Sequence, residues 1–243
     1  MSRPFVSVVT PTYNRRHFLP MLIHLYQAQT YPADRRELVI LDDSPTSNED
    51  IIPKNDMSIR YIYQSEKIPL GEKRNKLNEL AKGDIIVCFD DDDYQFPERI
   101  SYSVVKLNAE KTDIAGCSII DIYYTDIDKT YQFGPYGRNH GTNGTFAYRR
   151  KYFENHKYDN KKNGQEEPEF TNNFTEKMAN LDQAKTILCI SHDSNTYDKR
   201  NLLKQNQLKR EVGIKLNKMI KDKVYLQFLK ETSARMKKEK IVT

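Results

Sequence analysis

The sequence Ile-Ile-Val-Cys-Phe-Asp-Asp-Asp-Asp, residues 85–93, joins a short apolar run to four consecutive carboxylates. The apolar part is rich in β-branched residues, which is typical of a strand buried on both faces of a mainly parallel sheet. Four adjacent aspartates repel one another unless a cation compensates their charge. Because alternate residues of an extended segment face the same side, Asp90 and Asp92 would face one divalent ion, with Asp91 and Asp93 facing elsewhere. Such oxygen ligands suit Mg²⁺ or Mn²⁺. An acidic surface loop is the alternative interpretation.

Three further strands are predicted upstream, because residues 5–10, 37–41 and 59–63 form short apolar runs. Helical periodicity occupies residues 18–29 and 71–81. We interpret this order as three strand-helix units before the fourth strand. Strands that alternate with helices favour a doubly wound, mainly parallel α/β sheet with right-handed crossovers.

Polar residues follow three of these four strands. The first strand runs into Thr-Pro-Thr-Tyr-Asn at residues 10–14, the second into Asp42-Asp43, and the fourth into the aspartates of residues 90–93. In open α/β sheets ligands bind beyond the carboxyl ends of the strands. The sequence therefore predicts that these three segments, far apart along the chain, lie on one edge of the sheet.

The second half of the chain has a different character. Pro97 begins a predicted helix, and residues 114–124 form a strand or a strand pair. Residues 134–148 are rich in Gly, Asn and Tyr, which suits either a loop and strand around a polar pocket or an ordinary surface hairpin. Residues 166–178 predict a helix whose first turn carries proline and clustered acids. A last buried strand is expected at residues 186–191.

Composition limits the class of protein. The 243 residues suffice for one large α/β domain, 30% of them are charged, and the mean hydropathy is −0.80. The sequence contains no apolar run near the roughly 20 residues that cross a membrane, and its start lacks the pattern of a secretory signal. We therefore expect a soluble, cytoplasmic protein, in the host cytoplasm if the source is a virus.

Charge divides the chain into an acidic body and a basic tail. Residues 199–243 hold 14 Lys and Arg against 4 Asp and Glu, whereas the preceding residues hold 25 against 30. The acidic body and the lack of a recognised motif argue against nucleic acid as a partner. Apolar residues recur at helical spacing in residues 201–242, so we expect helices that pack on the body or on a second copy in a homodimer. Peripheral contact of these basic helices with an anionic membrane is the alternative.

Four motifs, in this order and spacing, resemble the inverting family 2 glycosyltransferases of the GT-A fold, including the small soluble members of bacteria and large DNA viruses. The motifs are Val-Ser-Val-Val-Thr-Pro-Thr-Tyr-Asn-Arg at 6–15, Leu-Asp-Asp-Ser at 41–44, Gly-Glu-Lys-Arg-Asn at 71–75 and Phe-Asp-Asp-Asp-Asp-Tyr-Gln-Phe-Pro-Glu-Arg at 89–99. The resemblance covers about residues 4–200. It implies a GT-A domain at 1–200, with a nucleotide-sugar-binding half at 1–100 and an acceptor-binding half at 101–200. A basic helical extension would follow at 201–243.

The resemblance also implies the residues that bind the nucleotide. Thr10, Pro11 and Tyr13 would bracket the nucleobase, and Asp42 or Asp43 would hydrogen-bond it. Arg74 would lie against the nucleotide, and Asp91 would lie near the ribose.

The same resemblance implies a metal site. Asp90 and Asp92 would form the Asp-x-Asp metal motif, and His192 would complete the coordination of Mn²⁺ or Mg²⁺. The alternative interpretation of His192 is a strand-end histidine that is satisfied by the backbone.

The chemistry of sugar transfer assigns further residues. The leaving diphosphate gains negative charge, which a divalent ion and nearby cations such as Lys199 or Arg200 can neutralise. The acceptor hydroxyl needs a carboxylate to take its proton, and Glu166 and Glu167 are the candidates. By the order of the family's acidic pair, whose second member is commonly Asp, we choose Glu167. A solvated helix start is the alternative interpretation of both.

The expected function is therefore metal-dependent, inverting transfer of a sugar from a nucleoside diphosphate sugar, with a UDP-sugar as the expected donor, to an acceptor hydroxyl. The acceptor would be a glycan, a lipid-linked molecule or a protein. The rival classes are a nucleotidyltransferase or an aspartyl phosphatase, and a non-catalytic module that binds nucleotide sugars. A phosphatase nucleophile would follow the first strand, which here carries no acid.

Overall fold

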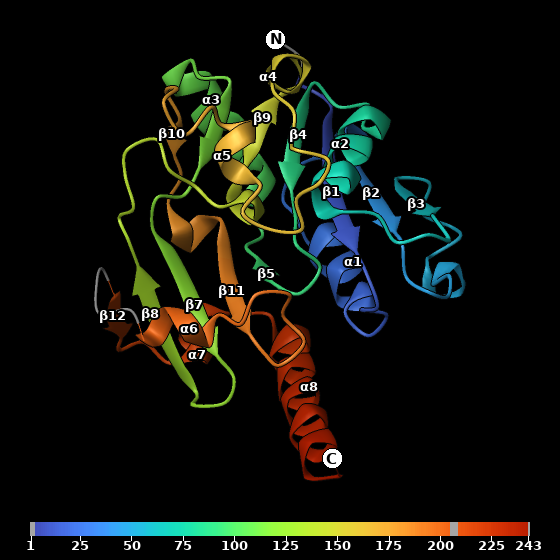
Figure 1. Cartoon of the computed structure of the whole chain (residues 1–243), viewed down its shortest axis with the longest axis vertical. Coiled ribbons are helices and arrows are strands. Elements are labelled where there is room, and N and C mark those ends of the chain that lie inside the picture. The colour runs from blue at the N-terminus through green and yellow to red at the C-terminus, as the bar shows by residue number, and fades with distance from the viewer. Residues whose placement is uncertain (1–2, 205–208, 243) are drawn as a thin grey trace.

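Two sheets form the frame of the protein, which is described here by a computed structural model of residues 3–204 and 209–242 (Figure 1). In spatial order, the first sheet contains β10 (Ala179–Asn180), β6 (Ile114–Gly116), β9 (Ala147–Arg149), β4 (Ile85–Cys88), β1 (Val6–Thr12), β2 (Arg36–Asp42) and β3 (Ile59–Tyr63). The neighbours β4, β1, β2 and β3 pair in parallel, and β9 is antiparallel to both β4 and β6. The predicted mainly parallel sheet is confirmed.

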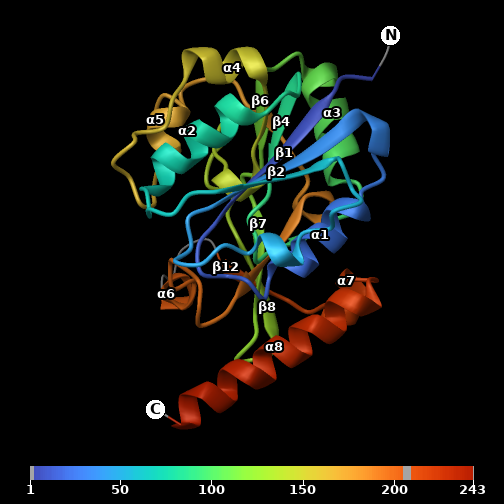
Figure 2. The ribbon, with the colours of Figure 1, turned by 90° about the vertical axis from the view of Figure 1, so that its right-hand side faces the viewer.

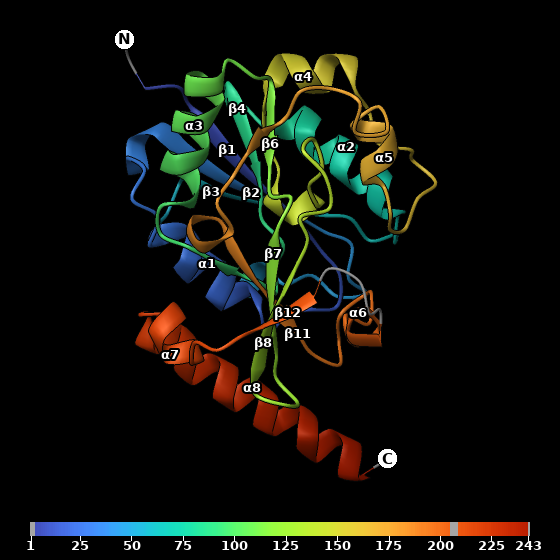
Figure 3. The same cartoon turned by 90° about the vertical axis from the view of Figure 1, so that its left-hand side faces the viewer.

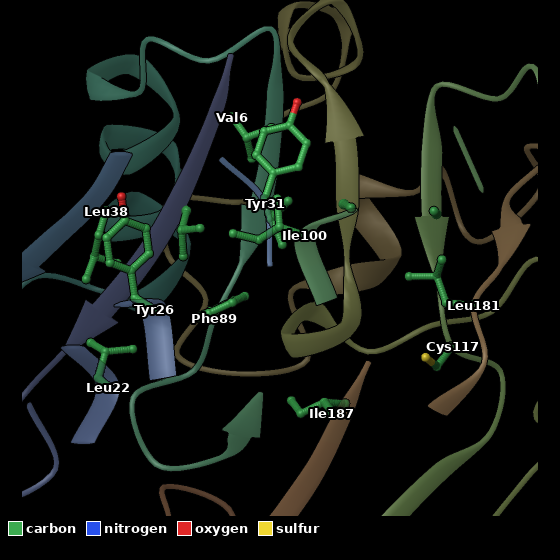
Figure 4. Packing of buried hydrophobic residues seen from close by; sticks show 14 of the residues in the cluster. Val6, Leu22, Tyr26, Tyr31, Leu38, Phe89, Ile100, Cys117, Leu181 and Ile187 are labelled. Carbon is green, nitrogen blue, oxygen red and sulfur yellow. The ribbon is translucent and has the colours of Figure 1, made fainter. Parts of the chain in front are cut away.

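Side chains of the central strands alternate between two apolar cores, as expected for strands covered on both faces. Helices α1 (Leu19–Gln27) and α3 (Arg99–Glu110) cover one face, and α2 (Leu70–Leu80), α4 (Arg150–Asn155) and α5 (Glu167–Phe170) the other (Figure 2). On the first face, Leu22 and Tyr26 of α1 lie near Leu38 of β2, in the same core as Val6 of β1 (Figure 4). This packing fixes the register of β1 and β2, and with it the position of the polar residues that follow them.

One connection differs from the prediction. Between β2 and β3 the chain forms only a 3-10 helix, Glu49–Ile51, so two strand-helix units precede β4 instead of three. In addition, β1 ends at Thr12, two residues later than predicted, because Pro11 and Thr12 remain in register with Leu41 and Asp42 of β2.

The second sheet contains, in order, β12 (Lys209–Val212), β8 (Lys129–Phe133), β7 (Ile120–Tyr124), β11 (Ile187–Ser191) and β5 (Tyr94–Gln95). β5 begins directly after the four aspartates and pairs antiparallel with β11. The aspartates therefore lie where the chain passes from the first sheet to the second.

The helix predicted at residues 166–178 is shorter than expected. α5 ends at Phe170, and Asn172, Asn173 and Phe174 have positive φ angles of 48°, 55° and 58°. Asparagine tolerates this left-handed backbone better than most residues. The apolar residues Phe170, Phe174 and Met178, which are four residues apart, therefore do not lie on one continuous helix. Phe170 and Met178 are nevertheless buried in the same core.

The C-terminal segment contains helices, as predicted, and also the unpredicted strand β12. Its helices are α6 (Arg200–Lys204), α7 (Leu216–Met219) and α8 (Lys223–Val242), and α8 lies beneath the second sheet (Figure 3). Tyr225 and Leu229 of α8 are buried in a third core with Leu188 and Ile190 of β11. The start of α8 thus packs on the body of the protein. Within the described residues, every helix is too short or too polar to cross a lipid bilayer.

Candidate active site

The carboxyl ends of β1, β4 and β11 meet between the two sheets. Thr12, at the end of β1, donates a hydrogen bond of 2.6 Å from Oγ1 to Oδ2 of Asp91. His192 follows β11, and its Nε2 lies 3.2 Å from Oδ2 of Asp92. The prediction that the segments after the first and fourth strands meet at one edge is confirmed. We call residues 90–93 the acidic turn.

The acidic turn is not extended, so the expected alternation of its side chains is wrong. Nη1 of Arg15 lies 2.7 Å from Oδ1 of Asp91 and 2.5 Å from Oδ2 of Asp92. Two consecutive carboxylates therefore share one cation, because the backbone turns at these residues. Asp90 instead places Oδ1 3.5 Å from Nη2 of Arg74.

Arg15 is a cation that contacts two aspartates of the acidic turn. Sequence reasoning assigned it no role. Although burial disfavours its charge, the carboxylates of Asp91 and Asp92 raise the pKa of Arg15. Its Nη2 also donates hydrogen bonds to the carbonyl oxygen of Ser194 at 2.9 Å and to Oγ1 of Thr196 at 3.3 Å. Arg15 thus connects the acidic turn to the loop that follows β11.

The three buried aspartates of the turn differ in charge. Burial raises the pKa of Asp91 to about 6 and that of Asp93 to about 7. Burial acts on Asp92 in the same direction, but the positive charges of Arg15 and Lys199 outweigh it and hold the pKa of Asp92 below its usual range. Asp92 is therefore the carboxylate with the strongest tendency to remain ionised.

Asp92 and His192 have the chemistry of metal ligands. A carboxylate oxygen and an imidazole nitrogen are ligands that Mn²⁺ accepts. No group of three or more His, Cys, Asp or Glu side chains suited to a metal ion occurs in the part of the chain that the structure describes. Magnesium sites commonly use one or two carboxylates, with substrate phosphates and water completing the shell. The pair fits an ion that binds together with a phosphate-bearing ligand.

Lys199 lies inside the site, paired with Asp93. Its Nζ lies 3.1 Å from Oδ1 of Asp93 and donates a hydrogen bond of 2.9 Å to the carbonyl oxygen of Ile190. The backbone N–H of Ile190 in turn donates to Oδ1 of Asp93 at 2.8 Å. This arrangement fixes the acidic turn against β11.

Arg200 lies farther out. Its Nη1 is 2.9 Å from Oδ1 of Asp193, its Nε is 2.7 Å from Oδ1 of Asp198, and 36% of its side chain is exposed. Both partners are surface carboxylates, so this ion pair network contributes little to stability.

The two predicted aspartates at the end of β2, Asp42 and Asp43, differ in their hydrogen-bond and ion-pair partners. Asp42 is fully buried and accepts hydrogen bonds from Ser44, Asn48 and Tyr61, which occupy both of its oxygens. Asp43 pairs through Oδ1 with Lys73 and accepts one hydrogen bond of 2.9 Å at Oδ2 from the backbone N–H of Ile68. Asp43 therefore retains more capacity to accept a hydrogen bond from a ligand.

Of the predicted nucleobase contacts, Thr10 is the most enclosed. It lies inside β1, its side chain has no exposed surface, and its hydroxyl has no hydrogen-bond partner among the described residues. Its contact with a nucleobase therefore stays a prediction. Pro11 and Tyr13 are partly exposed, and Nζ of Lys67 lies 3.9 Å from the centre of the Tyr13 ring.

The acidic pair at the start of α5 is joined to the acidic turn by Arg74. Nε of Arg74 lies 2.7 Å from Oε1 of Glu166, and Nη2 faces Asp90. Glu166 is 3% exposed, whereas Glu167 is partly exposed and accepts a hydrogen bond of 3.1 Å from the backbone N–H of Asn143. Burial and the negative charge of Glu166 raise the pKa of Glu167.

Gly144 brings the 3-10 turn Asn143–Thr145 against Asp90. A Cβ atom at residue 144 would lie 2.5 Å from Oδ2 of Asp90, which is too close for two non-bonded atoms. The glycine therefore allows the Asn143–Thr145 turn to approach the acidic turn, which favours the interpretation of residues 134–148 as part of the site over that of an ordinary surface hairpin.

Sequence reasoning missed three residues of this site: Thr12, Arg15 and Lys73. Thr12 and Arg15 stand within the first motif, and Lys73 within the third, so position in a motif was the available signal. Lys73 is 4% exposed and donates a hydrogen bond of 3.1 Å to the carbonyl oxygen of Thr12. It therefore links the ends of β1 and β2.

Comparison with known proteins gives an independent line of argument. The model of the glycosyl transferase family 2 matches residues 7–179. TuaG of Bacillus subtilis (strain 168), which bears the name of a teichuronic acid biosynthesis glycosyltransferase, is 35% identical over 95 residues, 37% of this chain and 37% of that protein. The glycosyltransferase GlyG of Streptococcus pneumoniae is 27% identical over 123 residues, 49% of this chain and 39% of that protein. The chain spans about half or less of the length of the curated relatives that it matches.

A solved structure with a similar fold is TarS 1–349 of Staphylococcus aureus in complex with UDP-GlcNAc. It has a TM-score of 0.63 and 17% identity, with 79% of this chain and 60% of that chain covered. The mannosyltransferase PcManGT of Pyrobaculum calidifontis, in complex with GDP-Man and Mn²⁺, has a TM-score of 0.58 and 14% identity, with 86% and 66% covered. These likenesses confirm the GT-A fold that the motifs imply. Because the family model matches well over half of the sequence, the chain belongs to glycosyl transferase family 2.

Proposed function

We propose that this protein is a metal-dependent, inverting glycosyltransferase that moves a sugar from a nucleoside diphosphate sugar, with a UDP-sugar as the expected donor, to an acceptor hydroxyl. The observation that carries the proposal is the contact between Asp92 and His192, which are 100 residues apart in sequence and 3.2 Å apart in the structure. It brings an ionised carboxylate and an imidazole together at the edge where ligands of open α/β sheets bind.

The nucleotide is proposed to bind at the ends of β1 and β2. Tyr13 and Pro11 offer an aromatic and an apolar surface to the nucleobase. Asp43 would accept a hydrogen bond from the base, because its oxygens are less occupied than those of Asp42. The N3–H of uracil is such a donor, so this acceptor is compatible with a uridine nucleotide. Asp91, held by Thr12 at the end of β1, is proposed to lie near the ribose.

The diphosphate is proposed to bind at the acidic turn. Asp92 and His192 would hold a divalent ion, which, when bound, neutralises the charge of the leaving diphosphate. Asp90 remains a proposed third ligand, although in this conformation it faces Arg74. Lys199 and Arg200 are proposed to add positive charge near the diphosphate. Because His192 offers nitrogen, Mn²⁺ suits this set better than Mg²⁺.

Transfer requires one base and one leaving group. The acceptor oxygen forms a bond to the anomeric carbon as the bond from that carbon to the diphosphate oxygen breaks, and the acceptor proton passes to a carboxylate. Attack from the face opposite the diphosphate inverts the anomeric centre. Glu167 is proposed as the base, because it is partly exposed and its pKa is raised, whereas Glu166 is buried and paired with Arg74.

The acceptor and the setting are also proposals. Similar proteins include one named as a poly(ribitol-phosphate) beta-N-acetylglucosaminyltransferase and one named as a beta-1,3-glucosyltransferase of an undecaprenol-linked saccharide. A glycan or a lipid-linked saccharide is therefore the acceptor class to test first, with a protein hydroxyl next. We propose a cytoplasmic location, where the protein would have direct access to nucleotide sugars. A homodimer and peripheral contact of the C-terminal helices with a membrane are further proposals.

The test is a panel of nucleotide sugars incubated with the protein in Mn²⁺ and, in parallel, in EDTA. We expect slow hydrolysis of one UDP-sugar in Mn²⁺ and none in EDTA, because water replaces the acceptor. Matched reactions with Glu167→Gln should show donor binding without hydrolysis. Binding without turnover by the unaltered protein, on addition of candidate acceptors as well, would instead favour a non-catalytic binding module.

A further inference from the structure

Tyr158 contacts three segments that surround the proposed base Glu167. It lies in the connection between α4 and α5 and is 3% exposed. Asn75 of α2 holds its backbone on both sides. The N–H of Tyr158 donates a hydrogen bond of 3.0 Å to Oδ1 of Asn75, and Nδ2 of Asn75 donates one of 2.8 Å to the carbonyl oxygen of Tyr158. Because Asn75 follows Arg74, Tyr158 is anchored next to the ion pair of Arg74 and Glu166.

The ring of Tyr158 packs against the end of α5. Its centre lies 4.1 Å from that of the Phe170 ring, and the two ring planes are 6° apart. Phe170 is the last residue of α5, the four-residue helix that begins at Glu167. Both rings belong to one core, in which Phe170 is fully buried. The stacked pair therefore holds α5, and with it the backbone of Glu167, against the connection from α4.

The hydroxyl of Tyr158 contacts the residue that binds the Glu167 carboxylate. Nδ2 of Asn143 donates a hydrogen bond of 2.6 Å to the hydroxyl oxygen of Tyr158. The backbone N–H of the same asparagine donates the bond of 3.1 Å to Oε1 of Glu167. Asn143 is 2% exposed, so its side chain has little access to water as a substitute partner. One asparagine thus connects the Tyr158 hydroxyl to one oxygen of the proposed base.

The bond from Asn143 affects both the charge and the direction of the Glu167 carboxylate. An N–H that donates to a carboxylate favours the ionised form. Burial and the charge of Glu166 raise the pKa of Glu167, and the N–H of Asn143 acts in the opposite direction. Because one oxygen is held, the carboxylate has a defined direction although the side chain is partly exposed.

We propose that Tyr158 is a positioning residue: its hydroxyl holds the side chain of Asn143, so that the N–H of Asn143 orients the Glu167 carboxylate toward the acceptor hydroxyl. The proposal rests on the function proposed above, in which Glu167 is the base. A displacement of about 1 Å near a reacting group can reduce turnover by about 100-fold. Loss of this one hydroxyl is therefore expected to lower turnover, although Tyr158 acts only through Asn143.

The experiment compares Tyr158→Phe with Tyr148→Phe. Each variant removes one hydroxyl from the same buried core and takes that partner from one asparagine side chain, Asn143 in the first case and Asn78 in the second. The two variants should therefore lose comparable stability. The chemical shift of the Asn143 amide is followed by NMR as the pH is lowered, because an N–H bonded to a carboxylate reports its protonation. Glu167→Gln identifies this titration, since it removes the carboxylate.

We expect the Asn143 amide to titrate in the unaltered protein and in Tyr148→Phe, and its change in shift to fall at least about twofold in Tyr158→Phe. Asn143→Ala removes the same bond from the other partner and keeps the backbone N–H, so it should show the same loss and decides the question if Tyr158→Phe does not fold. An undiminished titration in a folded variant would overturn the role of Tyr158. So would the absence of a titration in the unaltered protein.

Turnover gives a second measurement, with the UDP-sugar that the unaltered protein hydrolyses and water as the acceptor. In Tyr158→Phe, kcat should fall about tenfold with an unchanged KM for the donor. The acidic limb of the kcat profile should move to higher pH, because the carboxylate has lost a bond that favours its ionised form. Tyr148→Phe should keep both values.

The two measurements separate this inference from the proposed function. A kcat and an acidic limb in Tyr158→Phe equal to those of the unaltered protein would overturn the positioning role and leave the proposed function intact. If the unaltered protein hydrolyses no nucleotide sugar, with or without added acceptors, the proposed function is wrong. The NMR titration then still decides whether Tyr158 holds Asn143 against Glu167.

Discussion

Nε of Arg74 lies 2.7 Å from Oε1 of Glu166, and this buried ion pair separates the roles of two adjacent glutamates. Glu166 contacts the guanidinium group of Arg74 and has little exposed surface. Glu167, the next residue, accepts a backbone hydrogen bond from Asn143 and remains partly exposed. These contacts support the proposal that Glu167, and not Glu166, takes the proton of the acceptor hydroxyl.

The first prediction compares the replacement of Glu167 and of Glu166 by glutamine. Glu167→Gln keeps the size of the side chain and removes the proton acceptor, so kcat should fall by about 100-fold or more while donor affinity stays nearly unchanged. Glu166→Gln should instead lower the melting temperature, because it leaves the buried charge of Arg74 less well compensated. Full turnover in Glu167→Gln, together with loss in Glu166→Gln on a folded protein, would reverse the assignment.

The second prediction concerns the pH dependence of turnover. Burial and the charge of Glu166 raise the pKa of Glu167 above the ordinary value of 4.5. A base acts only when ionised, so kcat should fall as the pH drops through this raised pKa, and the acidic limb of the profile should lie above pH 4.5. The profile of kcat at saturating donor and acceptor measures this. A limb at or below pH 4.5 would show that Glu167 is not the titrating base.

The third prediction concerns Arg15. Removing one partner of a buried ion pair costs about 3 kcal/mol, so Arg15→Met should lower the melting temperature by roughly 10 °C in EDTA. Mn²⁺ with UDP should recover more stability in this variant than in the unaltered protein, because a second cation then compensates Asp91 and Asp92. Arg16→Met is the matched control, since Arg16 pairs with Asp50 at the surface. A melting temperature of Arg15→Met equal to that of the control would contradict this role.

The fourth prediction concerns Gly144. A methyl group at this residue would lie 2.5 Å from Oδ2 of Asp90, so Gly144→Ala must displace that carboxylate or the turn. A displaced group near the reacting centre should reduce kcat/KM by about tenfold or more. Gly213→Ala is the control, because a methyl group there meets no atom within 4 Å. If both variants have unaltered kcat/KM, the close approach of the Asn143–Thr145 turn to Asp90 has no functional role.

Strand ends were predictable from the sequence because an apolar run followed by polar residues marks them locally. This rule placed Asp42, Asp43 and the acidic turn correctly at one edge of the sheet. It placed the end of β1 two residues too early, because β1 continues through Pro11 and Thr12 in register with β2, and pairing with a neighbour is not a local property.

Other parts of the site depend on tertiary structure. The shared contact of Arg15 with Asp91 and Asp92 requires the turn conformation, which a run of aspartates does not specify. The length of α5 depends on the left-handed backbone after Phe170. The burial of Tyr225 depends on the packing of α8 against β11, where helical periodicity predicted packing on the body or on a second copy and did not choose between them.

Calorimetric titration of UDP, in Mn²⁺ and in EDTA, tests the central claim most directly when it is done on the unaltered protein and on Asp92→Asn. Asn keeps the shape of Asp92 and removes the charge that, in the proposal, would draw a divalent ion beside His192. We predict that Mn²⁺ strengthens UDP binding at least about tenfold in the unaltered protein and has little effect in Asp92→Asn. Equal UDP affinity in Mn²⁺ and EDTA, or an undiminished Mn²⁺ effect in Asp92→Asn, would contradict the account.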